Sequence, residues 1–197
     1  MRTSSLILAL CLVGAVGADR VPVAAAQTDA GWTMLFDGEN LDNFTMTGNA
    51  NWRVTEGVAE ADMPRGYLVS LEAYTNFDLR MEVWTLPESN AGVMLRVGDP
   101  RAPSLRNGYE VNINDQRTDQ DGRTGSIVNI AAPLVKFDAG NKWVTVDISA
   151  IGPRMTVRLD GILTAEATDT TFASGQFALQ AAGGEVKYRN VQIRVAP

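Results

Sequence analysis

Apolar and polar residues alternate along most of the chain after residue 50. Side chains on a β-strand point to opposite faces in turn, so a period of two predicts strands with one buried face. No stretch keeps an apolar period of 3.6 residues for three turns, so helix should be minor. Strands are expected at 52–55, 58–61, 77–86, 91–97, 109–114, 125–130, 142–151, 154–160, 162–167, 175–181 and 186–195. About ten or eleven short strands predict an all-β, antiparallel sandwich or barrel.

Turn residues separate these strands. The pairs Glu56-Gly57 and Asp160-Gly161 are typical of two-residue hairpin turns. The longest polar or proline-containing loops, 98–107 and 116–124, flank the strand at 109–114. Loops gathered at one edge of a rigid sandwich are common places for binding and catalytic sites.

The segment Gly-Tyr-Glu-Val-Asn-Ile-Asn-Asp at 108–115 has the most regular alternation. Its aromatic and aliphatic side chains would enter the core, and Glu110, Asn112 and Asn114 would share the other face. One carboxylate and two amides in a row indicate a site for a polar ligand. A merely solvated strand face would give the same pattern.

The first 26 residues have the pattern of a secretory signal peptide. Arg2 is followed by an uncharged apolar run at 6–18, and three alanines at 24–26 precede Gln27. The run is too short for a bilayer core, which needs roughly 20 residues. We therefore expect cleavage near Ala26, with Ala18 as the alternative, no membrane insertion, and one mature domain at 27–197. This predicts a periplasmic or secreted protein.

Composition narrows the function further. Without residues 1–26 the chain keeps 15 basic and 22 acidic residues, a net charge of −7, which argues against nucleic acid as a partner. Cys11 is the single cysteine and leaves with the signal, so no disulfide is expected. The chain contains no histidine, which excludes Ser-His-Asp and Cys-His catalysis and zinc sites built on imidazole.

Several motifs occur in a fixed order from about residue 31 to 195. They are Leu-Phe-Asp-Gly at 35–38, Trp-Arg-Val at 52–54, Asn-Ala-Gly-Val-Met-Leu-Arg at 90–96, the segment 108–115, Thr-Gly-Ser-Ile at 124–127, Phe-Ala-Leu-Gln at 177–180 and Tyr-Arg-Asn-Val at 188–191. Together they resemble the 3-keto-disaccharide hydrolase domain family. The resemblance implies a concanavalin-like jelly-roll sandwich, export from a bacterial cell, and cleavage of glycosides whose sugar carries a ketone at C3. Ala181 and Asn112 stand where the family usually has histidine and glutamine.

The face that carries Glu110 suits such a substrate better than an ordinary glycoside. Ordinary glycosidases need two carboxylates flanking the scissile bond, whereas Glu110 is followed on its face by amides. A 3-keto sugar needs one base for the proton at C2 and one cation facing the enolate. Glu110 is the candidate base and Arg96 the candidate cation, although Arg96 could instead pair with Glu110 for structure alone. Asn112, Asn114 and Gln180 are candidate contacts for sugar hydroxyls, or simply exposed strand amides.

Two further features are open to two interpretations. Asp115, Asp119 and Asp121 gather oxygen ligands of the kind calcium prefers, but a solvated acidic turn has the same composition. Trp84 lies on the polar side of its strand, where it could stack on a sugar or pack beneath a loop.

The leading hypothesis is thus an exported enzyme that cleaves 3-keto glucosides or disaccharides by hydrolysis or elimination. The alternative, motivated by the missing histidine, is a non-catalytic carbohydrate-binding module. A scaffold protein of the cell envelope is a third candidate that no motif supports. The sequence specifies neither the sugar nor the oligomeric state.

Overall fold

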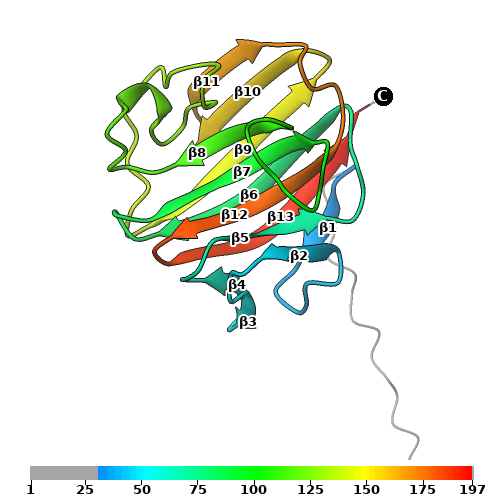
Figure 1. The fold of residues 1–197 in the computed structure, drawn as a ribbon, viewed down its shortest axis with the longest axis vertical. Helices are drawn as coiled ribbons and strands as arrows, with labels where there is room; N and C mark the ends of the chain where they lie inside the picture. Colours follow the sequence, from blue (N-terminus) through cyan, green and yellow to red (C-terminus); the bar gives the residue numbers. More distant parts are fainter. Residues whose placement is uncertain (1–30, 197) are drawn as a thin grey trace, which may run out of the picture.

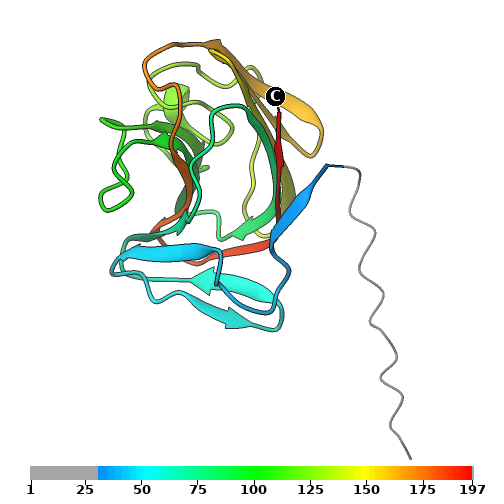
Figure 2. The ribbon, with the colours of Figure 1, turned by 90° about the vertical axis from the view of Figure 1, so that its right-hand side faces the viewer.

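The computed structural model describes residues 31–196 as two antiparallel β-sheets packed face to face (Figures 1 and 2). The eight-stranded sheet has the order β11-β10-β9-β6-β13-β4-β3, with β1 paired to β13, and the five-stranded sheet has the order β2-β5-β12-β7-β8. The strands are β1 (Thr33–Phe36), β2 (Phe44–Gly48), β3 (Arg53–Thr55), β4 (Val58–Ala61), β5 (Gly66–Ser70), β6 (Phe77–Thr85), β7 (Asn90–Val97), β8 (Tyr109–Ile113), β9 (Trp143–Ile151), β10 (Arg154–Leu159), β11 (Ile162–Thr168), β12 (Gln176–Gly183) and β13 (Val186–Val195). The expected all-β sandwich is confirmed.

The alternation along the strands sets which side chains form the core between the sheets. In β6 every second residue from Phe77 to Thr85 is buried. Tyr109, Val111 and Ile113 of β8 are at most 2% exposed and belong to the same core. This leaves Glu110 on the outer face of the five-stranded sheet, as the sequence predicted.

The turns at both predicted hairpins have the backbone that their sequences favour. Glu56 and Gly57 join β3 to β4 with φ of 50° and 81°, and Asp160 and Gly161 join β10 to β11 with φ of 49° and 78°. Two successive positive φ angles match the twist of the flanking strands.

Some expected elements differ from the observed ones. Residues 125–130 were expected to form a strand, but they form turns with isolated bridges at Ile127. Positive φ angles at Gly125 and Asn129 interrupt the extended backbone there. The strands β1, β2 and β5 were not anticipated; β5 is buried along its whole length, so it shows no alternation.

Two loops border the outer face of the five-stranded sheet. Between β7 and β8, residues 98–108 pass in front of β12 in Figure 1 and reach the opposite edge of the sheet, where Thr47 Oγ1 of β2 donates to the carbonyl of Pro100 at 3.3 Å. After β8, residues 114–142 include the 3₁₀ turn η1 (Gln120–Gly122) and lie beside that strand. Both loops therefore adjoin the strand that carries Glu110.

The proposed signal peptide at 1–26 lies outside the described residues. Among residues 31–196, none of the helical segments has the length and apolar character needed to cross a bilayer.

Candidate active site

Glu110 and Gln180 meet on the outer face of the five-stranded sheet. They belong to β8 and β12, which lie on either side of β7, and Gln180 Nε2 donates to Glu110 Oε1 at 3.2 Å. Strands are about 4.8 Å apart, so two side chains separated by a whole strand meet only if that strand leaves room between them.

Gly92 of β7 leaves this room. It is the direct partner of Gln180 on one side and of Asn112 on the other. A Cβ atom at this position would stand 3.5 Å from Glu110 Oε1 and from Gln180 Oε1, and 2.8 Å from the carbonyl oxygen of Val111. A side chain at Gly92 would therefore collide with the Val111 carbonyl oxygen, and its Cβ would be in van der Waals contact with both polar groups.

The environment of Glu110 favours its protonated form. Burial raises the pKa of the Glu110 carboxyl above its ordinary value, while the hydrogen bond from Gln180 and the charges of Arg117 and Arg65 oppose the rise. A carboxylate held this way is a stronger base than one in open water.

Gln180 has one unused hydrogen-bonding atom. The residue is 4% exposed, and its Oε1 atom has no partner among the described residues. Buried polar atoms are normally paired, so an unpartnered oxygen closed off from solvent at this point is unusual.

Apolar side chains cover the rest of this face. They form a second cluster, separate from the core between the sheets, in which each residue is at most 9% exposed: Tyr67, Val69, Met94, Val97 and Ala178. Tyr67 is the strand partner of Gln180. Glu110 and Gln180 therefore lie beside a dry surface, where hydrogen bonds and charges act more strongly than in water.

Tyr188 supports the site from the core side. Its hydroxyl lies 3.0 Å from the carbonyl oxygen of Gly92 and 2.9 Å from that of Gln180. The residue is fully buried, and burial raises the pKa of its phenol far above the ordinary value, so the hydroxyl stays a neutral donor. It links β13 of one sheet to β7 and β12 of the other directly beneath Glu110.

The predicted pairing of Arg96 with Glu110 is wrong. Arg96 is 1% exposed and donates to the carbonyl oxygens of Thr75 at 2.7 Å, Phe172 at 3.2 Å and Ala150 at 3.2 Å. Ala150 belongs to β9 of the opposite sheet, so the guanidinium lies between the sheets and away from the outer face.

The backbone explains this reversal. Arg96 follows Gly92 and Met94 at intervals of two, which would place it on the outer face of β7. Its φ of +52° and a register shift in the pairing of β7 with β12 break the alternation at this point. Such a bulge turns the side chain to the other face.

Arg65 and Arg117 are the guanidiniums that act on Glu110. Arg65 is exposed and directly precedes β5, next to the strand that carries Gln180. Arg117 lies in the loop after β8, with its nearest described carboxylate, that of Asp119, at 3.8 Å. Neither residue has a role that the sequence indicates, because nothing local in the sequence shows that their charges act on Glu110.

The amides of β8 have different environments. Asn112 is fully buried, and its Nδ2 donates to the carbonyl oxygen of Gly122, so it holds the loop after β8; its Oδ1 has no partner among the described residues. Its contact with substrate stays a prediction. Asn114 is partly exposed, and its contact with a sugar hydroxyl stays a prediction.

The predicted calcium site is also wrong. Asp115 already accepts hydrogen bonds from the backbone N–H groups of Ala139 and Gly140 and from Thr124 Oγ1. Asp119 caps η1 by accepting from the N–H group of Asp121 at 3.2 Å. Within residues 31–196, no three acidic, histidine or cysteine side chains converge as metal ligands.

Trp84 does not belong to the site around Glu110. It lies on the outer face of the eight-stranded sheet, next to Trp143 of β9 and with Lys187 Nζ 4.9 Å from its ring centre. The two sheets and the core between them separate it from Glu110.

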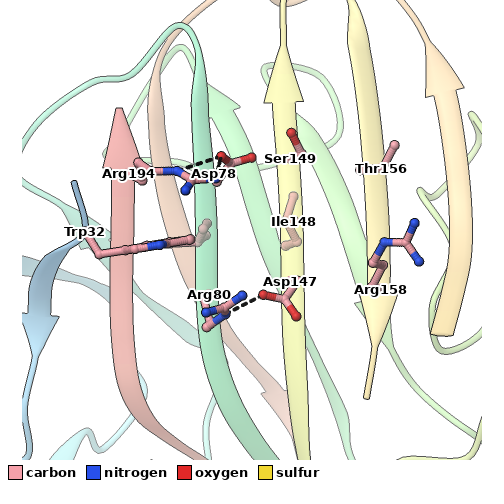
Figure 3. A pocket seen from close by; sticks show the side chains of 10 residues that line it. Trp32, Asp78, Arg80, Asp147, Ile148, Ser149, Thr156, Arg158 and Arg194 are labelled. Carbon is pink, nitrogen blue, oxygen red and sulfur yellow. Dashed lines mark hydrogen bonds and ion pairs between the residues drawn. The ribbon is translucent and has the colours of Figure 1, made fainter. Parts of the chain in front are cut away.

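The outer face of the eight-stranded sheet also carries a hollow, shown in Figure 3. Trp32 lies there between Arg80 and Arg194, each 5.0 Å from the ring centre. Both arginines are paired, Arg80 with Asp147 at 2.6 Å and Arg194 with Asp78 at 2.7 Å. This hollow therefore has no unpaired carboxylate comparable to Glu110.

Residues 31–194 match the family described as 3-keto-alpha-glucoside-1,2-lyase-like domain. None of the curated proteins matches the chain.

Solved structures share the fold. Two proteins from Parabacteroides distasonis ATCC 8503, each described as a "putative glycosyl hydrolase", are 18% and 22% identical, with TM-scores of 0.75 and 0.71. The alignments cover 85% and 84% of this chain and 94% and 99% of theirs. The carbohydrate-binding module CBM66 from Bacillus subtilis is 21% identical with a TM-score of 0.61, over 83% of this chain and 95% of that one.

Proposed function

The chain belongs to the 3-keto-alpha-glucoside-1,2-lyase-like domain family, and from this premise we propose that it cleaves 3-keto glucosides with Glu110 as the base. The observation that carries the proposal is the environment of Glu110. It is a largely buried carboxyl with a raised pKa, held by Gln180 and accompanied by the charges of two arginines. The matching substrate is an oxidised saccharide, since a single carboxylate does not suit an ordinary glycoside.

The ketone makes this single base sufficient. A carbonyl at C3 acidifies the hydrogen at C2, so Glu110 can take that proton while the C3 oxygen becomes an enolate. The enolate then expels the glycosidic oxygen from C1, which breaks the C1–O bond and forms a double bond between C1 and C2. The leaving oxygen receives a proton, and water adds across the double bond to give the free 3-keto sugar.

Each neighbouring group has a task in this sequence. Arg117 and Arg65 provide positive charge for the developing enolate. Gln180 Nε2 donates to Glu110 Oε1 and so holds the base in position. The pKa of the Glu110 carboxyl is raised towards neutral pH. A general base with a pKa near the working pH is still largely ionised and accepts a proton readily.

A second candidate function is sugar binding without turnover. It is favoured by Ala181, which stands where the family motif usually has a histidine, and by the shared fold with a carbohydrate-binding module. Saturable binding of a 3-keto glucoside with no release of its aglycone would establish this alternative.

We further propose that the protein acts outside the cytoplasm. This rests on residues 1–26, whose charged start, apolar run and alanines are typical of a cleaved signal. Amino-terminal sequencing of the protein recovered from the periplasm or medium tests it; a start at Gln27 is expected, and an intact Met1 in the cytosol would contradict it.

The enzymatic proposal is tested by replacing the base. With p-nitrophenyl 3-keto-α-glucoside, Glu110→Gln should lower kcat by about 100-fold or more, the usual contribution of a general base. Glu166→Gln is the matched control, because Glu166 is exposed and pairs only with Arg154. Unchanged turnover in Glu110→Gln would refute the role of Glu110, and p-nitrophenyl glucoside without the ketone should not react.

A further inference from the structure

Three of the four tryptophans lie on the outer face of the eight-stranded sheet. Trp32, Trp84 and Trp143 are partly exposed, whereas Trp52 is buried in the core. Large aromatic side chains are costly to leave in water, so this concentration on one face calls for a physical explanation.

Trp32 carries two cations over its ring, whereas Trp84 and Trp143 each carry one, Lys187 Nζ at 4.9 Å and the Arg189 guanidinium at 4.0 Å. In Figure 3 the ring of Trp32 lies between Arg80 and Arg194, so both faces of the indole are covered. Trp84 and Trp143 instead stand side by side as strand partners and border a cavity of about 210 Å³.

Four residues that line this cavity, Trp143, Trp84, Lys187 and Glu60, belong to a single row across the sheet. Trp143, Trp84, Lys187, Glu60 and Arg53 are consecutive direct partners on β9, β6, β13, β4 and β3. The hairpin of β3 and β4 adds Thr55 to the lining. Two indoles at one end of the row and charged hydrogen-bonding groups at the other thus face a common space.

The charged groups of the row neutralise one another. Arg53 pairs with Glu60 at 2.8 Å, and Lys187 lies 2.9 Å from Glu185 and 3.9 Å from Glu60. Both cations of the row are thus paired, and the exposed carboxylate of Glu56 also lines the cavity, so nothing in the lining attracts an anion. This favours a neutral, hydroxyl-rich ligand.

We propose that this cavity is a second saccharide-binding site, for a neutral pyranose unit of an oligosaccharide or polysaccharide. Indole rings suit the C–H faces of a pyranose, and Glu60 and Lys187 supply partners for its hydroxyls. The site lies on the opposite sheet from Glu110, so both sites can be occupied together. It requires no ketone, and it stands whether or not Glu110 is catalytic.

Calorimetric titration with cellohexaose and maltohexaose tests the proposal. The wild-type protein and Glu110→Gln should bind at least one of these neutral sugars saturably, with one site per chain. Trp84→Ala and Trp143→Ala should weaken binding at least tenfold. Trp32→Ala is the matched control on the same face and should bind as the wild type does.

A fifth variant keeps the test independent of folding. Thr55 is exposed and borders the cavity, so Thr55→Arg should fill the space without removing a ring, and should also weaken binding at least tenfold. The proposal is overturned if neither sugar binds the wild-type protein, if binding survives in folded Trp84→Ala and Thr55→Arg, or if it is lost in Glu110→Gln.

Discussion

Replacing Arg96 by methionine distinguishes a structural arginine from a catalytic one. The guanidinium donates to three carbonyl oxygens, those of Thr75, Ala150 and Phe172, which belong to three separate segments of the chain. Arg96→Met keeps the length of the aliphatic stem and removes all three donors. These contacts predict a large loss of stability with no specific loss of chemistry.

The size of the effect follows from these contacts. A hydrogen bond from a charged group contributes about 1.5–3 kcal/mol, so the three bonds together amount to roughly 5–9 kcal/mol. Removing a buried charge returns several kcal/mol of desolvation. We therefore expect the free energy of unfolding to fall by about 3 kcal/mol, a large share of the ~5–15 kcal/mol typical of a whole domain.

Urea denaturation at 25 °C measures this change, and turnover of a 3-keto glucoside in the absence of urea measures the chemistry. Arg101→Met is the matched control, because Arg101 is exposed and pairs only with Asp99 in its own loop; it should change stability by less than about 0.5 kcal/mol. A structural role for Arg96 is refuted if Arg96→Met has the same midpoint urea concentration as the wild type but loses turnover.

Three other variants probe the surroundings of the site. Because the folded state raises the pKa of Glu110, wild-type stability should decrease as the pH rises from the ordinary value of 4.5 through the raised one. Glu110→Gln should therefore be more stable than wild type at pH 7 and equal to it at pH 4; equal thermal midpoints at both pH values would contradict this. Asp115→Ala should lower the free energy of unfolding by about 2–4 kcal/mol, because it leaves three donors without their acceptor. Calcium should not change the wild-type thermal midpoint, and a saturable rise would restore the metal hypothesis. Tyr188→Phe should cost about 1–3 kcal/mol, because two buried carbonyl oxygens lose their donor, and it should lower kcat more than it raises KM. If kcat falls only in proportion to the fraction of Tyr188→Phe protein that is folded, Tyr188 acts through folding alone.

Much of the fold follows from local patterns in the sequence. The period of two placed Glu110 on an outer face and its apolar neighbours in the core, and the Asp160-Gly161 turn fixed one hairpin. These features depend only on residues close together in the chain, so a single sequence contains them.

The errors arose where distant segments meet. Arg96 has the parity of an outer residue, but its left-handed backbone turns it into the core. Asp115 looks like a free metal ligand until Ala139, 24 residues further on, is seen to donate to it. Trp84 was correctly assigned to a polar face, but the alternation of one strand does not say which sheet that strand joins.

The contact between Glu110 and Gln180 also depends on strand order. They are 70 residues apart in the chain, and they meet because β7 lies between their strands and has Gly92 at the crossing point. Sequence analysis named both residues as candidates, but only the sheet order brings them together.

The most direct test of Glu110 as the base that removes the C2 proton is to run the reaction in heavy water. The deuterium in the released sugar is then measured by mass spectrometry and located by NMR. Elimination followed by addition of water exchanges the hydrogen at C2, so the account predicts one carbon-bound deuterium at C2 of the released 3-keto glucose. Product incubated with Glu110→Gln in heavy water corrects for spontaneous exchange. Release of 3-keto glucose that keeps its original hydrogen at C2 would contradict the account, because the glycosidic bond would then have been cleaved without removal of that proton.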